Sequence, residues 1–235
     1  MSATLKEYVD LIYVINLPDH KHRLQYFFSQ VDNELRNNIQ IFRAVNGKKL
    51  DIRTIDESLI TDKGKKSIQK EKRRYGIDLT YGAIGCALSH YLILKETSKN
   101  SKPTVIFEDD IDIQTNISIQ IKKLLNISHA FDIIYLGIHN ISSHIKSNRI
   151  NNLFYKPKGM ICGTFGMIVS PSGADKILKT IFPITMQIDS EITKHQNKLN
   201  LLCCNNPLVK HTLKFGTSIQ GKNGLKTFVY NHEHY

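Results

Sequence analysis

Residues 104 to 112 read Thr104-Val105-Ile106-Phe107-Glu108-Asp109-Asp110-Ile111-Asp112, an apolar run that ends in acids. Val, Ile and Phe fit a pleated, buried surface, so residues 104–107 are predicted to form an interior strand. Carboxylates crowded at the end of such a strand repel one another unless a positive charge neutralises them. Divalent cations such as Mg²⁺ or Mn²⁺ prefer oxygen ligands and often bridge to phosphates. The stretch therefore predicts either a metal and diphosphate site or a solvated acidic turn.

The sequence on either side of this stretch predicts an α/β domain. Residues 11–17 and 39–45 have the composition of strands, and apolar residues at helical spacing over residues 20–36 predict an amphipathic helix between them. Later strands are predicted at residues 131–137, 163–169 and 200–204, and later helices at 82–98, 117–125 and after Ser170-Pro171. This order is typical of a mostly parallel central sheet flanked by helices. Since no repeat or linker interrupts the pattern, we expect a single domain over residues 1–235.

The composition is that of an ordinary globular protein with an excess of positive charge. The chain has 235 residues, of which 41% are hydrophobic and 23% charged, and its formal net charge is +11. Such a charge favours an anionic partner: nucleic acid, an anionic membrane surface or a phosphorylated substrate. Charge alone does not separate these three classes.

The cysteines and the apolar runs indicate in which cellular compartment the protein works. Cys86, Cys162, Cys203 and Cys204 follow no metal-ligand spacing, which favours buried thiols in a reducing environment over a disulfide framework. No apolar run approaches the length of a bilayer span, and the N-terminus lacks a signal-peptide core. We therefore expect a cytoplasmic protein that could contact a membrane peripherally through its basic surface.

Two segments differ from the predicted core. Residues 48–80 hold few large apolar groups, and their basic residues include Lys63, Lys65, Lys66, Lys70, Lys72, Arg73 and Arg74. Long irregular segments in compact domains are usually functional lids or disordered. The segment is predicted to be a basic lid or acceptor loop, with a solvated basic loop as the alternative. Residues 212–235 are predicted to form a basic, polar C-terminal tail.

Four short motifs occur along the chain. They are Ile15-Asn16-Leu17 with Arg23 downstream, Ala44-Val45-Asn46-Gly47, Gly82-Ala83-Ile84-Gly85-Cys86-Ala87-Leu88-Ser89-His90, and Ile106-Phe107-Glu108-Asp109-Asp110. In this order they resemble the motifs of glycosyltransferase family 25, the bacterial lipooligosaccharide glycosyltransferases related to collagen galactosyltransferases. Weaker similarities follow at residues 132–137, Gly163-Thr164 and Ile188-Asp189. The third motif followed by Glu-Asp-Asp is the specific part, since each fragment alone is weak.

The resemblance implies a GT-A-like fold and an inverting transfer of a hexose from a nucleotide sugar. It favours UDP-galactose as the donor, with UDP-glucose second, and a lipooligosaccharide or lipopolysaccharide oligosaccharide as the acceptor. The sequence departs from the family at Ala83, where the family usually has Glu, so any role of that carboxylate is absent or moved. Pro18-Asp19-His20 stands where the family tends to carry arginines, which predicts fewer phosphate contacts there.

The same resemblance assigns roles to residues of the motifs. A divalent cation, Mn²⁺ or Mg²⁺, would stabilise the leaving nucleoside diphosphate, with Asp110 as its first ligand and Glu108 and His211 as the others. A surface histidine is the alternative for His211. The donor would contact Asn16, Leu17 through its backbone, Arg23, Asn46, Gly47, Ser89, His90, Glu108 and Asp109. From the residues alone, a hydrogen-bonded, half-buried helix residue is the preferred explanation of His90.

Inversion also requires a base to activate the acceptor hydroxyl, away from the metal cluster. Asp189 is the first candidate and Glu191 the second, and both lie where a short helix is predicted to begin. Carboxylates at that position also stabilise a helix N-terminus by capping, which is the structural alternative.

The basic excess then has a target in a phosphorylated glycolipid acceptor at an anionic membrane surface. Two other functions compete with this one. A nucleic-acid-binding protein would explain the charge, but the sequence contains no binding motif, and its basic and aromatic residues form no recognisable platform, so we expect no nucleic-acid partner. A degenerate transferase that binds sugar or lipid without catalysis would explain Ala83.

Overall fold

The computed structural model describes residues 3–70, 74, 76–128, 130–139, 149–216 and 219. Within these residues the main sheet has seven strands. From one edge to the other they are β2 (Gln40–Arg43), β1 (Leu11–Asn16), β3 (Thr104–Glu108), β7 (Gly166–Val169), β5 (Ile133–Tyr135), β8 (Leu201–Cys204) and β6 (Phe154–Tyr155).

The sheet is mixed but mostly parallel. Strand β1 pairs in parallel with β2 and with β3, and β5 pairs in parallel with β8. Strand β7 is antiparallel to both β3 and β5, which leaves those two strands in the same direction, and β6 is antiparallel to β8. The predicted α/β class, with a mostly parallel central sheet, is confirmed. Strands β1 and β3 end side by side, because Ile15 is in register with Glu108.

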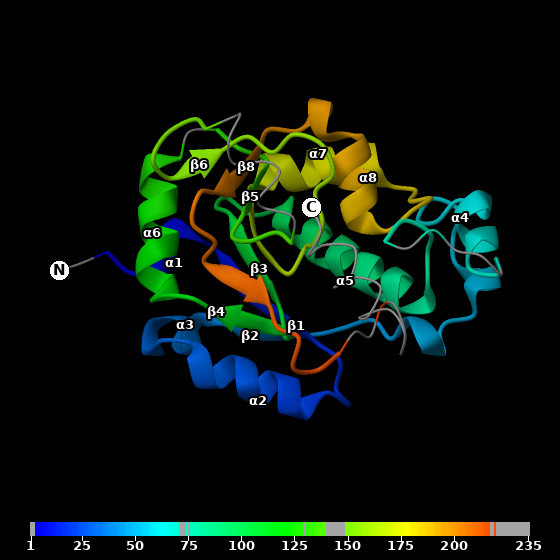
Figure 1. The fold of residues 1–235 in the computed structure, drawn as a ribbon, viewed down its shortest axis with the longest axis horizontal. Helices are drawn as coiled ribbons and strands as arrows, with labels where there is room; N and C mark the ends of the chain where they lie inside the picture. The colour runs from blue at the N-terminus through cyan, green and yellow to red at the C-terminus, as the bar shows by residue number, and fades with distance from the viewer. Residues whose placement is uncertain are drawn as a thin grey trace.

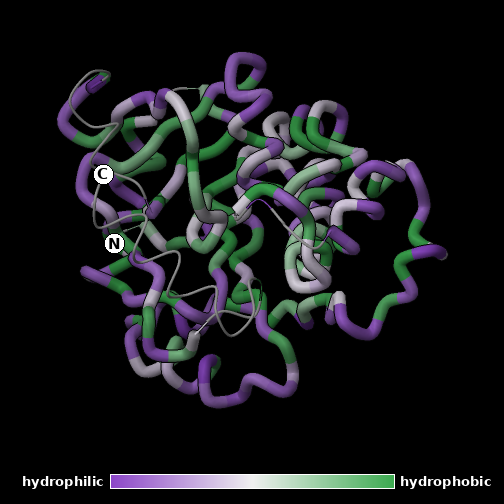
Figure 2. The backbone as a smooth tube through the Cα atoms, turned by 45° about the vertical axis from the view of Figure 1, so that its right-hand side comes forward, coloured by the Kyte–Doolittle hydropathy of each residue, from purple (hydrophilic) through white to green (hydrophobic). Residues whose placement is uncertain are grey.

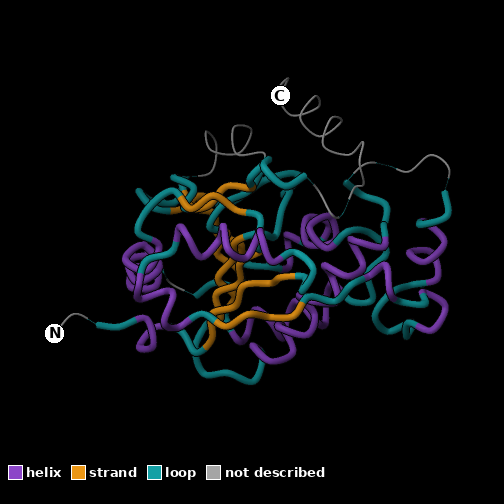
Figure 3. Tube along the Cα trace, turned by 90° about the horizontal axis from the view of Figure 1, so that it is seen from below, coloured by secondary structure: helices purple, strands orange, loops and turns teal. Residues whose placement is uncertain are grey.

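Helices cover both faces of this sheet (Figures 1 and 3). One face packs against α5 (Tyr81–Thr97), α7 (Pro171–Ile181) and α8 (Ile188–Lys194). The other packs against α1 (Leu5–Tyr8), α2 (Lys21–Gln30), α3 (Asn33–Asn38) and α6 (Ile117–Ile127). None of the helices in the described ranges has the length and apolar character that crossing a bilayer requires.

Alternation along the strands divides the core between these two faces. In β1, Ile12 and Val14 belong to one cluster of buried side chains and Tyr13 and Ile15 to the other. This period of two is what a strand buried on both sides requires. The tube is accordingly green along much of the central sheet and purple over many outer segments (Figure 2).

The prediction of one continuous helix over residues 20–36 is wrong. The structure has two helices there, α2 ending at Gln30 and α3 beginning at Asn33. Asp32 breaks the run because its side chain accepts a hydrogen bond from the backbone amide of Leu35, which caps α3. The same carboxylate also accepts the hydroxyl of Ser118 at the start of α6.

A second, two-stranded sheet lies beside the acidic end of β3. Strand β4 (Ile111–Ile113) pairs antiparallel with β9 (Val209–His211), and Ile111 is in register with His211. The amide of Thr212 continues the pairing by donating to the carbonyl of Asp110 at 2.8 Å. This pairing brings a segment a hundred residues away in sequence against the acidic stretch.

Residues 48–80 are more ordered than their composition predicts. They contain short 3-10 turns at Gly47–Lys49 and Ile52–Thr54, and helix α4 (Asp62–Ser67). Ile60 and Leu79 are fully buried and anchor the segment in the core. A role as a lid stays a prediction, and Lys72 and Arg73 lie outside the described residues. Most of the predicted tail, after Gly216, also lies outside them.

Loop 44–47, which follows β2, packs against α5 through two glycines. A Cβ on Gly47 would come within 1.7 Å of the Tyr81 carbonyl oxygen, and one on Gly85 within 2.3 Å of the Val45 carbonyl oxygen. The hydroxyl of Ser89 accepts the amide of Val45 at 2.8 Å and locks the loop in place. The second and third sequence motifs are therefore packed against each other.

Replacement of Gly85 by Ala tests this contact. In a helix the change ordinarily stabilises by roughly 0.5–1 kcal/mol, because glycine loses more backbone entropy on folding. Here we expect a loss of about 1–3 kcal/mol in the free energy of unfolding, since the new methyl meets backbone that must shift. Urea unfolding measures the difference. Leu92→Ala, at an exposed position of the same helix, is the control and should change stability far less; a stabilised Gly85→Ala protein would contradict the packing described here.

Candidate active site

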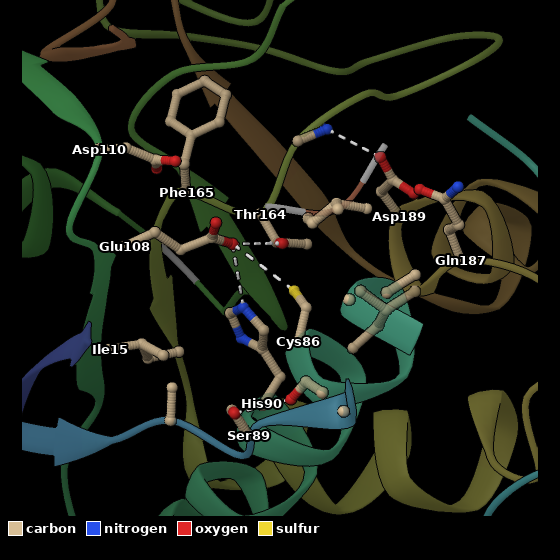
Figure 4. Close-up of a pocket in the computed structure, with 18 of the residues that line it drawn as sticks. Ile15, Cys86, Ser89, His90, Glu108, Asp110, Thr164, Phe165, Gln187 and Asp189 are labelled. Atoms are coloured by element: carbon tan, nitrogen blue, oxygen red, sulfur yellow. Dashed lines mark hydrogen bonds and ion pairs between the residues drawn. The ribbon is translucent and has the colours of Figure 1, made fainter. Parts of the chain in front are cut away.

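A cavity of about 830 Å³ opens at the edge of the sheet where β1 and β3 end. Figure 4 shows Glu108 and Asp110 on one side of it and Asp189 on the other, with Cys86 and His90 of α5 beneath. Of the site residues predicted from sequence, those that line the cavity are Leu17, Asn46, Gly47, Ser89, His90, Glu108, Asp109, Asp110, Asp189 and His211. Ligands lie at this edge of open α/β sheets because the strand ends leave a crevice there.

Glu108 is held by donors from two different elements. Its Oε1 atom accepts the hydroxyl of Thr164 at 2.9 Å, and His90 Nε2 lies 3.3 Å from the same oxygen. The thiol of Cys86 is 3.9 Å away and also donates to it. Burial and the charge of Glu108 raise the pKa of this thiol well above its ordinary value, so it carries the proton that it donates. One carboxylate oxygen is thus fixed by the protein.

Asp109 and Asp110 are buried, and side chains from α2 and β1 compensate their negative charges. Arg23 Nη1 lies 2.8 Å from Asp110 Oδ2 and 3.6 Å from Asp109 Oδ1, and Asn16 Nδ2 donates to Asp109 at 2.5 Å. Arg23 is itself only 5% exposed and does not line the cavity. Arg23 Nη2 donates to the carbonyls of Phe215 and Gly216 at 3.3 Å. Asn16 and Arg23, predicted as donor contacts, therefore support the acidic stretch from behind.

The two aspartates differ in protonation. Burial and the neighbouring charge of Asp110 raise the pKa of Asp109 to about 7, against the opposing effects of Asn16 and Arg23. Burial would also raise the pKa of Asp110, but the bond to His211 and the nearby Arg23 hold it below its ordinary value. Asp110 is therefore the carboxylate that stays charged at neutral pH.

His211 is brought to this carboxylate by the pairing of β9 with β4. Its Nε2 lies 3.5 Å from Asp110 Oδ2. Two further atoms, Asp110 Oδ1 and His211 Nδ1, are buried and have no hydrogen-bond partner within the described part of the chain. Carboxylate oxygen and imidazole nitrogen both ligate divalent cations such as Mn²⁺, so Asp110 and His211 fit such an ion.

Asp189 faces the cavity from the start of α8. Its carboxylate accepts the amides of Gly163 at 3.1 Å and of Ser190 at 2.8 Å, which fix its orientation. Burial raises its pKa to about 6, and these amide bonds only partly oppose the effect. A carboxylate with this pKa is charged at neutral pH and still basic enough to accept a proton.

Glu191 is placed differently, two residues further along α8. It is 2% exposed, does not line the cavity, and its Oε1 accepts the amides of Thr185 and Met186 at 2.6 and 3.0 Å. Its carboxylate thus holds the turn that precedes the helix. This placement favours Asp189 over Glu191 as a base.

Several cavity residues were not among the site residues predicted from sequence. Thr164 and Cys86 touch Glu108, and Gln187 and His139 also line the cavity. The rings of His139 and His211 lie 5.1 Å apart, centroid to centroid. Thr164 and Cys86 belong to motifs that the sequence does display, so their position in a motif was a signal. His139 lies outside those motifs.

Comparison with known proteins identifies the family. The model of glycosyltransferase family 25 (LPS biosynthesis protein) matches residues 9–192. A glycosyltransferase 25 family member of Aedes aegypti is 26% identical over 200 residues, 81% of this chain and 32% of that protein. Procollagen galactosyltransferase 1-A of Xenopus laevis is 29% identical over 178 residues, 72% of this chain and 28% of that protein.

A third relative, probable inactive glycosyltransferase 25 family member 3 of Rattus norvegicus, is 31% identical over 134 residues, 54% of this chain and 22% of that protein. The chain therefore spans about a third or less of the length of these three relatives. The matched region holds the whole acidic stretch and Asp189, and leaves His211 outside. Since the family model covers well over half of the chain, this protein belongs to glycosyltransferase family 25.

Proposed function

We propose that this protein transfers a hexose from a nucleotide sugar to a glycan acceptor with inversion at the sugar carbon. One observation carries the proposal: a single cavity joins the acidic end of β3, the loop 44–47 and, opposite, the carboxylate of Asp189. A diphosphate leaving group needs positive charge, and an attacking hydroxyl needs a base. The groups suited to these two tasks lie on opposite sides of the cavity.

The residues divide the chemistry as follows. A divalent cation, Mn²⁺ or Mg²⁺, would be held by Asp110 and His211 with Glu108, and would offset the charge that develops on the diphosphate. Asp109 and Glu108 accept hydroxyl hydrogen bonds from the donor, and the backbone of Leu17 with Asn46 and Gly47 lines the pocket for the nucleoside. Asp189 takes the proton of the acceptor hydroxyl as that oxygen bonds to the sugar carbon.

UDP-galactose is the proposed donor and UDP-glucose the alternative. The support is a relative named as a procollagen galactosyltransferase, which is 29% identical over 178 residues. The family description as an LPS biosynthesis protein supports a lipooligosaccharide or lipopolysaccharide acceptor over collagen. The reaction would then take place on the cytoplasmic side of a membrane that presents this glycolipid.

A panel of nucleotide sugars, each assayed with and without Mn²⁺, tests the proposal. We expect metal-dependent hydrolysis or transfer with one UDP-hexose. Asp110→Asn should lower that turnover at least about tenfold, because the cation loses a charged ligand. Asp112→Asn is the matched control two residues away. Its carboxylate bonds to the hydroxyl of Tyr26 and does not line the cavity, so turnover should persist.

Two other functions are separated by the same panel. If no nucleotide sugar is bound or turned over, the transferase proposal is wrong. Binding without turnover would favour a degenerate sugar-binding protein, which the Ala83 departure and the relative named as probably inactive both support. A nucleic-acid-binding protein would bind its ligand equally well with Asn at position 110.

The base assignment is tested by comparing two conservative changes on one helix. Asp189→Asn should lower kcat by about 10²–10⁴ with little change in the KM for the donor, because it removes the proton acceptor while its amide oxygen keeps one of the two backbone bonds. Glu191→Gln keeps an oxygen for the amides of Thr185 and Met186 and should retain most activity. The opposite pattern would move the base to Glu191.

The pH profile supplies a second measurement on Asp189. A base works only when deprotonated, so kcat should rise with pH and level off above about 6, the pKa to which burial raises Asp189. With Asn at position 189, the residual rate should no longer show this rise. Stopped assays from pH 5 to pH 8 would record both profiles.

Exposed basic residues on and next to α4 support an anionic acceptor. Lys63, Lys66 and Lys70 are exposed on or next to α4, while Lys65 donates to the carbonyl of Ile55. We propose that this surface attracts phosphorylated groups of a glycolipid and holds the protein peripherally at an anionic membrane.

Ionic strength tests the electrostatic part of this proposal. Transfer to a phosphorylated acceptor in anionic vesicles should fall several-fold as salt rises, because exposed charges are screened. Transfer to a soluble, uncharged analogue is the control and should change little. Lys63→Gln with Lys66→Gln should reduce the salt dependence; equal rates at all salt concentrations would exclude electrostatic attraction.

A further inference from the structure

We propose that Cys86, His90 and Glu108 form a second cation site, selective for a borderline-soft divalent ion such as Zn²⁺. It is distinct in chemistry from the oxygen-rich site at Asp110, although both would use Glu108. Nothing in the proposed transfer requires this site, and its existence does not depend on which sugar is transferred.

The geometry of the three ligand atoms fits a small cation. His90 Nε2 is 3.3 Å and Cys86 Sγ 3.9 Å from Glu108 Oε1, and all three atoms lie within 4.8 Å of one another. In a tetrahedral zinc site with bonds of about 2.0–2.3 Å, ligand atoms stand roughly 3.3–3.7 Å apart. Small side-chain rotations therefore suffice to bring the three atoms to bonding distance.

The arrangement depends on both α5 and β3. Cys86 and His90 are four residues apart on α5 and so project from the same face of the helix. Glu108 is the last residue of β3, which that face packs against. Figure 4 shows the thiol, the imidazole and the carboxylate pointing toward one another. The ligand set is thus held by two regular elements rather than by loops.

The donor atoms decide which ion is favoured. A thiolate and an imidazole are soft or borderline ligands that suit Zn²⁺ and discriminate against Mg²⁺ and Mn²⁺, which prefer oxygen. All three residues line the cavity, so an ion can enter and a fourth position stays open to water. Three protein ligands with one open position is the pattern of zinc sites that are not purely structural.

Without a metal the same atoms form hydrogen bonds, and binding must replace them. The thiol proton that now points to Glu108 would leave to solvent as the Cys86 sulfur bonds to the ion. To bind an ion, His90 Nε2 must be free of its proton, which can move to Nδ1. His90 Nδ1 has no hydrogen-bond partner in the described part of the chain that would prevent this. Thr164 keeps its own bond to Glu108 and needs no change.

Occupancy of this site would offset the negative charge of Glu108, which is proposed to contact the donor and the Mn²⁺ ion, a consequence that rests on the proposed function. Zn²⁺ is then an inhibitor of the Mn²⁺-dependent reaction. The binding itself, however, is measured without any nucleotide sugar. A failed transfer assay and a failed metal site are therefore separate results.

Cobalt(II) is the probe, because a bond from thiolate to Co²⁺ produces a charge-transfer absorption in the near ultraviolet. Protein treated with a chelator and then dialysed is titrated with Co²⁺. We expect the thiolate band to saturate at one equivalent, to disappear when equimolar Zn²⁺ is added, and to resist a tenfold excess of Mn²⁺. The band should be lost in Cys86→Ser. It should persist in Cys162→Ser, the matched control, since Cys162 lines the same cavity outside the cluster.

His90→Gln gives a second variant that keeps the thiol. It should weaken Co²⁺ binding at least about tenfold, because one of three protein ligands is lost. Circular dichroism of each variant checks that it is folded. Absence of the band in the folded, unsubstituted protein would overturn the proposal, whatever the variants do. A band that survives Cys86→Ser, or that requires Cys162, would overturn it as well.

Discussion

The structure depends on three consecutive carboxylates at the end of β3, of which Asp109 and Asp110 are buried and Glu108 is partly buried. Charged groups removed from water lose several kcal/mol of solvation each, so they persist only where other charges and donors compensate them. Arg23 and His211 compensate Asp110, Asn16 compensates Asp109, and Thr164 and His90 compensate Glu108. Partners from α2, β9, β1, the segment before β7 and α5 must all reach one point, so this cluster restricts how those elements can be arranged.

The family motifs are therefore one another's partners. The first and fourth meet through Asn16 and Arg23, and the third and fourth through His90. The second and third meet where Gly85 and Ser89 hold Val45. Residues that a sequence motif marks can thus support the pocket through the side chains that line it. Arg23 is the clearest case, since both of its terminal nitrogens bond to aspartates or backbone carbonyls and it does not line the cavity.

Sequence patterns predicted the α/β class, the main strands and the acidic stretch, because each depends on local periodicity. They also brought Asp189 into consideration as a base. They failed where contacts between distant residues decide the structure. Residues 20–36 have one helical period, yet the run breaks at Asp32, whose carboxylate caps the second helix and also accepts the hydroxyl of Ser118, 86 residues away. Residues 48–80 lack periodicity, yet Ile60 and Leu79 are anchored in a core formed mainly by later elements.

The sequence by itself determined where the carboxylates lie along the chain and which apolar strand leads into them. Strand propensity and the spacing of acids are both local properties. Only the tertiary structure decided what each carboxylate does. Asp189 and Glu191 share a helix and look equivalent in sequence, but one faces the cavity and the other holds backbone amides. Likewise, His211 meets Asp110 only because β9 pairs with β4. Orientation and long-range pairing come from packing, which no local pattern records.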